Sequence, residues 1–209
     1  MRFTALDIWQ LGKATARPYK PWDNDKVRSY YPNRIMPITV GSDYAYYMEC
    51  ETWQGVFVNG SDDVPDWIRN CMWFRFNRYG AAAGFFNPAV GISEIAGKLR
   101  NEKPLLVEGF SRGGAMATTI GRLLDADLTV IFGSPKPGGR RYRNWIGELP
   151  VYNFQVRKDI VPKLPLIRGC HVGKRIMLNS PHNRLRIKTV HTSYEDCGID
   201  NYEFELEEE

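Results

Sequence analysis

The chain has 209 residues, which suits a single domain, and 43% of them are hydrophobic, enough to build a core of ordinary globular size. Aromatic residues make up 13% of the chain, which excludes a disordered protein, because disordered chains avoid residues that need burial. The formal net charge is +4 and is unevenly spread: five glutamates lie in residues 203–209, so the body of the chain is mildly basic.

The first 35 residues are rich in Arg, Tyr and Pro and show little periodicity, which predicts an irregular or partly helical N-terminal cover. Residues 45–51 and 54–58 are dense in aromatic and β-branched residues, and this predicts two neighbouring strands. Residues 61–70 open like a helix, with acidic residues in the first turn and a proline early. No repeat or linker interrupts the chain, so we expect residues 36–202 to form one domain, followed by an acidic tail at 203–209.

The middle of the chain alternates between helical and strand patterns. Apolar residues recur at helical spacing in two segments, namely Ile92, Ile95, Ala96 and Leu99, then Met116, Ile120, Leu123 and Leu124. Short apolar runs predict buried strands at residues 105–107, 128–132 and 151–156. Helices that alternate with wholly apolar strands imply a mostly parallel sheet with helices on both faces, which is an α/β fold.

A glycine-flanked serine, Gly109-Phe110-Ser111-Arg112-Gly113, lies between a predicted strand and a predicted helix. On such a tight turn, side chains two residues before and after the serine would collide with neighbouring backbone, so both positions need glycine. The turn pushes the hydroxyl out above the sheet and aims the first amides of the helix at a reacting carbonyl. The pattern by itself also fits a glycine-rich turn without chemistry. Its position between strand and helix favours a nucleophile.

A serine hydroxyl needs a base to take its proton, and histidine usually supplies it. The chain has three histidines, His171, His182 and His191, and all follow Ser111, so their order does not choose among them. Asp159 follows the predicted strand at 151–156, and active sites of open α/β sheets collect at the C-terminal ends of strands. An aspartate in such a loop is more often a turn former than a catalytic acid, so both interpretations stay open here.

Four segments, in the same order, resemble the class 3 lipase family, the fungal-lipase-like branch of the α/β-hydrolases. Residues 58–67 are similar to its strand ending in Phe-Arg-Gly-Thr/Ser with a downstream Asp-Trp, and residues 109–114 resemble its Gly-His-Ser-Leu-Gly-Gly elbow. Residues 132–135 resemble its Phe-Gly-Ser/Ala-Pro, and residues 159–165 its Asp-x-Val-Pro-x-x-Pro. The resemblance covers roughly residues 50–195 and implies an α/β-hydrolase fold.

The resemblance implies roles for single residues. In the family the aspartate of the fourth segment is the triad acid, and the base lies near the C-terminus, commonly as His-x-x-Tyr, which residues 191–194 match. The Thr/Ser after the strand glycine contributes its backbone amide and hydroxyl to the oxyanion hole, together with the amide that follows the nucleophile. The expected triad is therefore Ser111, Asp159 and His191, and the expected oxyanion hole is Ser61 and Arg112.

The other two histidines have different interpretations. His171 resembles a separate family feature beside the loop of the triad acid, where histidine is not the base. His182, in Ser-Pro-His-Asn, is typical of a surface turn, but it remains the alternative base. The chain also departs from the family, with Asn59, Phe110 and Arg112 where it usually has arginine, histidine and an apolar residue. We expect the Arg112 charge to lie near the mouth of the site, which favours an anionic or polar ester over a long-chain triglyceride.

An apolar stripe runs through residues 64–74, where lipases of this family carry a mobile lid over the acyl groove. Aromatic and methionine stripes at helical spacing are usually core, so a lid and a core helix both stay open for residues 62–74. The sequence is consistent with lipid substrates.

We therefore expect a carboxylic ester hydrolase: a lipase, a phospholipase or a small-ester esterase. Two alternatives stay open: acyl transfer or amide cleavage on the same scaffold, and a non-catalytic binding protein on a hydrolase fold. No metal or organic cofactor is implied, because triad chemistry needs neither.

The expected partners are an ester or lipid substrate and, transiently, a lipid surface. No nucleic acid is expected, because no basic block is interleaved with aromatics. The four cysteines show no metal-ligand spacing. With no signal sequence or spanning segment evident, we expect the chain in the cytoplasm.

Overall fold

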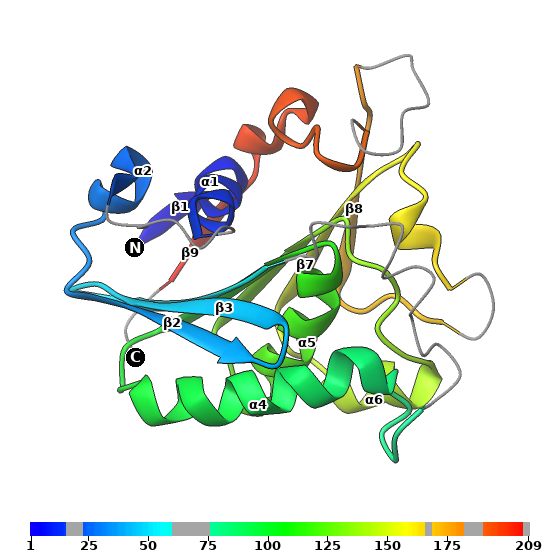
Figure 1. The fold of residues 1–209 in the computed structure, drawn as a ribbon. Helices are drawn as coiled ribbons and strands as arrows, with labels where there is room; N and C mark the ends of the chain where they lie inside the picture. The colour runs from blue at the N-terminus through cyan, green and yellow to red at the C-terminus, as the bar shows by residue number, and fades with distance from the viewer. Residues whose placement is uncertain (16–22, 60–75, 166–168, 182–189, 207–209) are drawn as a thin grey trace.

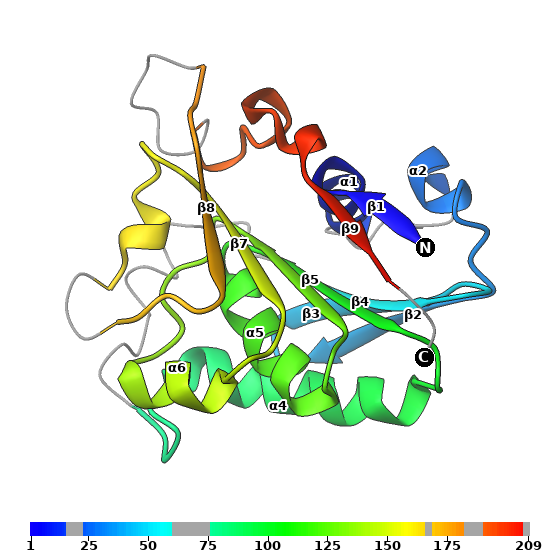
Figure 2. The same cartoon turned by 180° about the vertical axis from the view of Figure 1, so that it is seen from behind.

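The computed structural model describes residues 1–15, 23–59, 76–165, 169–181 and 190–206. Its centre is a seven-stranded sheet in the order β2-β3-β4-β5-β6-β7-β8 (Figures 1 and 2). The strands are β2 (Arg34–Val40), β3 (Asp43–Glu49), β4 (Gln54–Val58), β5 (Leu105–Phe110), β6 (Leu128–Phe132), β7 (Val151–Val156) and β8 (Lys174–Leu178). Strands β2 to β4 are antiparallel and β4 to β8 are parallel. The mostly parallel α/β sheet predicted from the sequence is thus confirmed.

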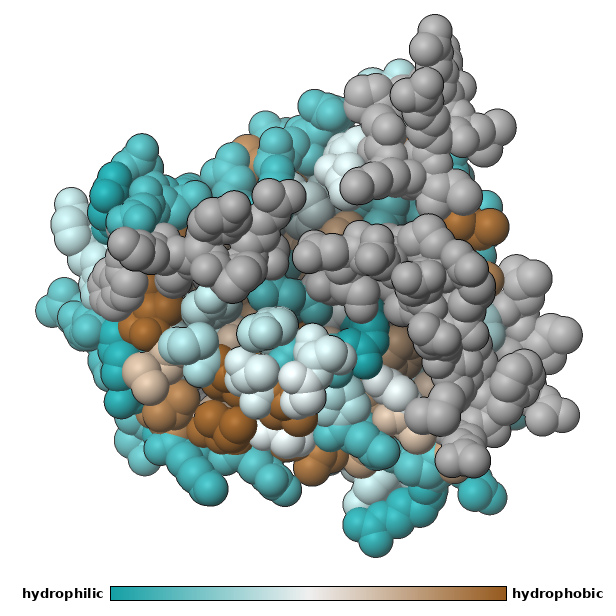
Figure 3. All heavy atoms as spheres, viewed as in Figure 1, coloured by the Kyte–Doolittle hydropathy of each residue, from teal (hydrophilic) through white to brown (hydrophobic). Residues whose placement is uncertain are grey.

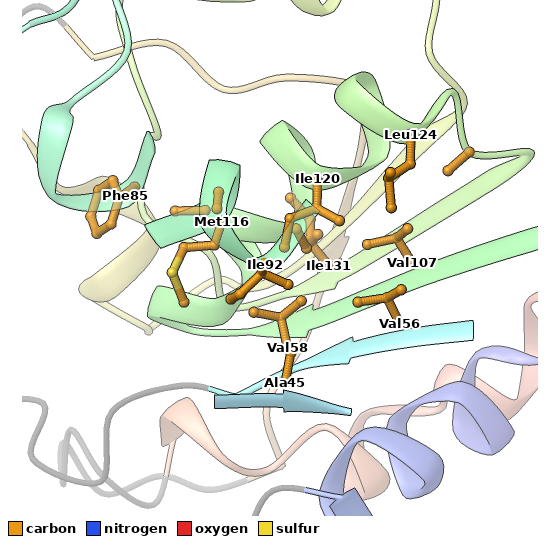
Figure 4. Close-up of a cluster of buried hydrophobic side chains, with 14 of the residues drawn as sticks. Ala45, Val56, Val58, Phe85, Ile92, Val107, Met116, Ile120, Leu124 and Ile131 are labelled. Atoms are coloured by element: carbon orange, nitrogen blue, oxygen red, sulfur yellow. The ribbon is translucent and has the colours of Figure 1, made fainter. Parts of the chain in front are cut away.

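Helices cover both faces of this sheet. One face carries α4 (Ala83–Leu99), α5 (Arg112–Leu124) and α6 (Arg140–Ile146), and the other carries α1 (Ala5–Thr15), as Figure 1 shows. The central strands β4, β5 and β6 are buried almost throughout, because helices exclude water from both of their faces. Figure 4 shows the core between α4, α5 and the sheet, where Val56, Ile92, Met116 and Ile131 pack together.

The two predicted helices are present, but each has one apolar residue outside the buried face. Ile95 of α4 is 37% exposed, and the buried side chains of that helix instead include Phe85, Ala89 and Ile92. Leu123 is 42% exposed, in the last turn of α5. The predicted stripes were therefore slightly too wide. Burial follows one continuous face of the helix, and apolar residues beside that face stay in solvent.

The N-terminal segment, expected to be irregular or partly helical, contains strand β1 (Arg2–Thr4), helix α1 and helix α2 (Asp25–Arg28). Residues expected in the acidic tail form strand β9 (Glu203–Glu205), which pairs with β1 antiparallel and places Phe3 opposite Phe204. Three-residue strands carry little periodicity, so only this long-range pairing reveals them. The edge strands β2 and β8 were likewise not predicted. The division into cover, domain and tail stays a prediction.

Three short 3-10 helices complete the described elements: η2 (Val161–Lys163), η3 (Glu195–Cys197) and η4 (Ile199–Asn201). Within the described ranges, no helix is long and apolar enough to cross a bilayer. Figure 3 shows apolar residues at the surface over α4 and the β2–β3 hairpin, where Met36 and Ile95 are exposed.

Candidate active site

Ser111 lies at the turn between β5 and α5, where the sequence predicted a nucleophile elbow. Its backbone has φ 54° and ψ −122°, a strained conformation for a residue with a side chain, and its amide donates a hydrogen bond of 2.8 Å to the Phe132 carbonyl. A Cβ on Gly109 would overlap the carbonyl of Gly113, and one on Gly113 would overlap the end of β4. The steric reason for both glycines is therefore confirmed, and the serine is held in a fixed position.

The first turn of α5 begins directly after the serine. The first amides of a helix have no acceptor within it, and they lie at the positive end of the helix dipole. The amide of Arg112 is the first of these, which is where an oxyanion donor is required. Ser61, predicted as the other donor, lies outside the described residues, as do the predicted helix at 61–70 and the lid candidate at 62–74.

Asp159 and His191 form a buried pair. Asp159 follows β7, His191 comes from the C-terminal part of the chain, and Nδ1 of the imidazole lies 2.5 Å from Oδ2 of the carboxyl. The other carboxyl oxygen accepts a bond of 2.9 Å from the Val161 amide. The two residues are only 2% and 1% exposed, so the carboxyl is held by hydrogen bonds on both oxygens in a site closed to solvent.

The imidazole of His191 lies beside the elbow. Its ring centroid is 4.6 Å from that of Phe110, the residue immediately before Ser111. Within the described residues, neither Nε2 of His191 nor Oγ of Ser111 has a hydrogen-bond partner, and both atoms are buried. The two atoms therefore do not bond each other in this structure. Each is a buried polar atom that a bound substrate or a change of rotamer could engage.

An aromatic layer that the sequence did not predict supports both groups from the α1 face. The Trp9 ring contacts Phe110, Phe132 and Tyr194 at centroid distances of 5.0 to 5.1 Å. Its indole nitrogen donates a hydrogen bond of 3.2 Å to Glu195. Helix α1 therefore packs against the residue before the nucleophile and the segment after His191 at the same time. No local pattern in residues 1–15 signals this role.

From the sequence we expected the charge of Arg112 to lie near the mouth of the site. In the structure the side chain is instead held within the protein. Its guanidinium pairs with the buried carboxyl of Asp43 and donates a hydrogen bond of 3.0 Å to the Gly84 carbonyl. Burial lowers the pKa of Arg112 from its ordinary value. The positive charge is thus compensated within the protein. The expectation of an anionic substrate, which depended on that charge, loses its basis.

Of the other two histidines, His171 has its partner outside the Asp159–His191 pair. His171 is half-buried, and its Nδ1 lies 3.0 Å from Nε2 of Gln155. Burial, together with the nearby charges of Arg175 and Lys136, lowers its pKa to about 4, so it stays neutral at physiological pH. His182 lies outside the described residues. No three His, Cys, Asp or Glu side chains converge as metal ligands in the part of the chain that the structure describes.

Comparison with known proteins returned matches among solved structures alone: no family model and no curated protein matches. The chain is similar to the lipase of Rhizopus microsporus var. chinensis, with 17% identity over 88% of this chain and 78% of that one and a TM-score of 0.68. It is also similar to Yarrowia lipolytica Lip2 lipase, with 16% identity over 97% and 83% of the two chains and a TM-score of 0.68.

A third match, to the Rhizomucor miehei triacylglyceride lipase, has 17% identity, covers 85% and 82% of the two chains and has a TM-score of 0.66. At such identities the similarity is one of fold. The chain has the α/β-hydrolase fold of fungal lipases, in agreement with the class 3 lipase resemblance.

Proposed function

We propose that this protein is a serine-dependent carboxylic ester hydrolase of the lipase or esterase type. In this proposal Ser111 is the nucleophile, His191 the general base and Asp159 the acid that orients it. The observation that carries the proposal is the buried hydrogen bond between Asp159 and His191, formed beside an elbow that holds Ser111 with a free hydroxyl. The fungal lipase fold supports the same reaction class.

The reaction begins when an ester carbonyl is placed against Ser111. Nε2 of His191 takes the hydroxyl proton as Oγ attacks the carbonyl carbon, and the resulting imidazolium is stabilised by the Asp159 carboxylate. The same proton then passes to the departing alkoxide, which leaves an acyl group on Oγ. A water molecule, deprotonated in turn by His191, attacks the acyl carbon and releases the carboxylic acid, and the proton returns to Ser111.

The tetrahedral intermediates carry a negative charge on the former carbonyl oxygen. The backbone amide of Arg112, at the start of α5, and the amide and hydroxyl of Ser61 are the proposed donors to this oxyanion. The loss of one such donor typically lowers kcat by about 100- to 1,000-fold. The ion pair of Arg112 with Asp43 anchors the residue that presents one of these amides.

The substrate that we propose is an uncharged ester or lipid. The charge of Arg112 is compensated by Asp43, so no anionic group is called for at that position. The structural neighbours are lipases, including one named a triacylglyceride lipase, which favours a lipid ester as the substrate class.

The test is hydrolysis of p-nitrophenyl esters of increasing acyl length, together with labelling by a fluorophosphonate probe. Wild type should turn over the esters and label, and Ser111→Ala should do neither, because the probe reacts with the activated serine. Ser93→Ala is the matched control, since Ser93 is a buried serine of α4 that bonds only its own helix. Its turnover and labelling should equal those of wild type.

Each other outcome assigns a different function. Labelling without ester hydrolysis, combined with product formed on an added alcohol or amine, would assign acyl transfer. A folded wild type that neither labels nor hydrolyses, with or without lipid micelles, would contradict the proposal and leave a non-catalytic binding protein.

A further inference from the structure

Positive charge is concentrated in one stretch of the chain. Residues 133–181 contain ten lysines and arginines and two acidic residues, Glu148 and Asp159. Asp159 is buried against His191, so Glu148 alone offers a carboxylate at the surface of this stretch. The net charge of the whole molecule, +4, hides this segregation because the C-terminal segment is acidic.

The fold brings these charges to one side of the molecule. Helix α6 buries Tyr142 and Ile146 and leaves Arg140, Arg141 and Arg143 exposed. Residues 157–165 carry the proposed catalytic acid, and we call them the acid loop. In this loop Arg157 and Lys163 are exposed as well. Figures 1 and 2 show α6, η2 and β8 along the same side, at the right in the first view and at the left in the second. We call Arg140, Arg141, Arg143, Arg157 and Lys163 the basic face.

Backbone contacts join the parts of this face. The amide of Lys136, ahead of α6, donates a hydrogen bond of 2.7 Å to the Leu164 carbonyl in the acid loop. The amide of Cys170 donates one of 2.7 Å to Gly138. Lys136 and Arg175 also lie close enough to His171 for their charges, after burial, to lower its pKa. The segment ahead of α6 and the end of the acid loop are therefore neighbours in the fold.

The cations of the basic face differ from several basic residues elsewhere on the surface. Arg2, Lys13 and Arg34 each form an ion pair with a glutamate. In the described structure, none of the five residues of the basic face pairs with a carboxylate. Because no carboxylate among the described residues pairs with these cations, they are available to an anionic partner.

An apolar side chain stands among these cations. Ile160 is 42% exposed and lies between Arg157 and Lys163, directly after the proposed catalytic acid. Lipid interfaces bind surfaces that combine Lys and Arg with apolar side chains able to enter the acyl boundary. Single-stranded nucleic acid instead needs aromatic faces for its bases, and near this face Tyr142 is buried while Trp145 stacks on Tyr79. The chemistry of the face therefore favours lipid.

We propose that the basic face docks the protein on an anionic lipid surface, with Ile160 entering the interface and the arginines of α6 contacting the headgroups. The acid loop belongs both to this face and to the proposed active site, so docking would place the site at the membrane. That benefit rests on the proposed ester hydrolase function, whereas the binding itself does not require catalysis.

The test is co-sedimentation of the full chain with vesicles, made of phosphatidylcholine alone or with added phosphatidylglycerol. Wild type should bind the anionic vesicles and not the neutral ones, and added salt should release it. The triple variant Arg140→Glu, Arg141→Glu, Arg143→Glu should bind at least about 100-fold more weakly, since each basic residue near an anionic membrane contributes about fivefold. Ile160→Asn should weaken binding by about tenfold through lost apolar insertion.

The matched control reverses three exposed charges away from the basic face. Arg2→Glu, Arg28→Glu, Lys98→Glu changes the net charge by the same amount, at positions on β1, α2 and the end of α4. It should retain wild-type binding. If both triple variants lost vesicle binding equally, binding would depend only on the net charge of the protein, and the proposal would be overturned. So would equal binding to neutral and anionic vesicles, or binding of a single-stranded oligonucleotide without binding of vesicles.

The experiment is repeated with Ser111→Ala to separate this proposal from the enzymatic one. Ser111→Ala should bind vesicles as wild type does, because Ser111 is buried and takes no part in the surface. A protein that binds vesicles without hydrolysing esters would refute the proposed function and keep the docking surface. A protein that hydrolyses esters without binding anionic vesicles would refute the docking surface and keep the proposed function.

Discussion

The imidazole of His191 is fixed by contacts on several sides. Asp159 holds Nδ1, the Phe110 ring packs against one side, and the backbone of Gly133 lies close on another. A Cβ on Gly133 would come within 2.7 Å of Cε1 of the imidazole and 2.9 Å of the Tyr194 hydroxyl. The glycine of the Phe-Gly-Ser-Pro segment therefore leaves the space that the histidine occupies.

We expect Gly133→Ala to lower kcat for ester hydrolysis by about 100-fold, because a 1 Å displacement of a catalytic group can cost that much. Gly147→Ala is the control. Gly147 has a similar φ, 64° against 58°, but a Cβ there would have no neighbour nearer than 3.9 Å. Both variants should lose about 1–2 kcal/mol of stability from the left-handed backbone. Equal kcat in the two variants, measured on a p-nitrophenyl ester beside thermal melts, would contradict a steric role for Gly133.

At the scale of secondary-structure elements, the buried ion pair of Arg112 and Asp43 joins three parts of the fold. Asp43 begins β3, Arg112 begins α5, and the Gly84 carbonyl that also accepts from Arg112 belongs to the first turn of α4. The side chains of Arg112 and Asp43 are only 18% and 10% exposed. Removing one partner leaves the other charge buried, which costs more than the pair contributes when intact.

Asp43→Asn should therefore lower the free energy of unfolding by about 3 kcal/mol, measured by urea denaturation. Replacing both charges, in Asp43→Leu with Arg112→Leu, should recover most of that loss, because no unpaired charge remains. Glu49→Gln breaks pairs with Arg34 and Lys103 at the other end of the same strand, where the cations are more exposed. It should cost less than about 1 kcal/mol. A double variant less stable than Asp43→Asn would refute this explanation.

At the scale of the whole molecule, two layers close over the sheet, and the α1 layer buries a carboxyl. Glu108 points from β5 toward Gly12 of α1, where an added Cβ would overlap its carboxyl group. The residue is 1% exposed, and Oε1 has no hydrogen-bond partner in the described structure. Burial raises the pKa of Glu108 well above its ordinary value of 4.5. The folded protein therefore keeps this carboxyl neutral at pH values where the unfolded chain ionises it.

The stability of the whole fold should therefore depend on pH through Glu108. Above about pH 4.5 the unfolded chain releases this proton and the folded chain keeps it, so the free energy of unfolding falls as pH rises. Glu108→Gln removes that dependence. The free energy of unfolding of the variant should exceed that of wild type by up to about 1.4 kcal/mol for each pH unit above 4.5. This difference stops growing at the pKa that Glu108 has in the folded protein. Parallel stability curves for the two proteins between pH 4 and 8 would contradict a buried neutral carboxyl.

Local patterns predicted the central strands and the two long helices because each depends on short-range chemistry. The largely apolar runs within β5, β6 and β7 are typical of buried strands or short buried helices, and the flanking turns decide between them. The elbow is local as well, because Gly109 and Gly113 are required by atoms within a few residues of Ser111 or at the adjoining strand end. The three-residue strands β1 and β9 could not be predicted, since each has meaning only when paired with the other.

By itself, the sequence determined the α/β class, the position of the elbow and a short set of candidates for acid and base. The tertiary structure decided which groups meet: Asp159 with His191, Phe110 against the imidazole, Arg112 with Asp43 and Trp9 beneath the elbow. The physical reason is the distance along the chain over which each kind of interaction acts. Strand and turn preferences arise from sterics and burial within a few residues, whereas ion pairs, ring contacts and a collected surface charge join residues that only the folded chain brings together.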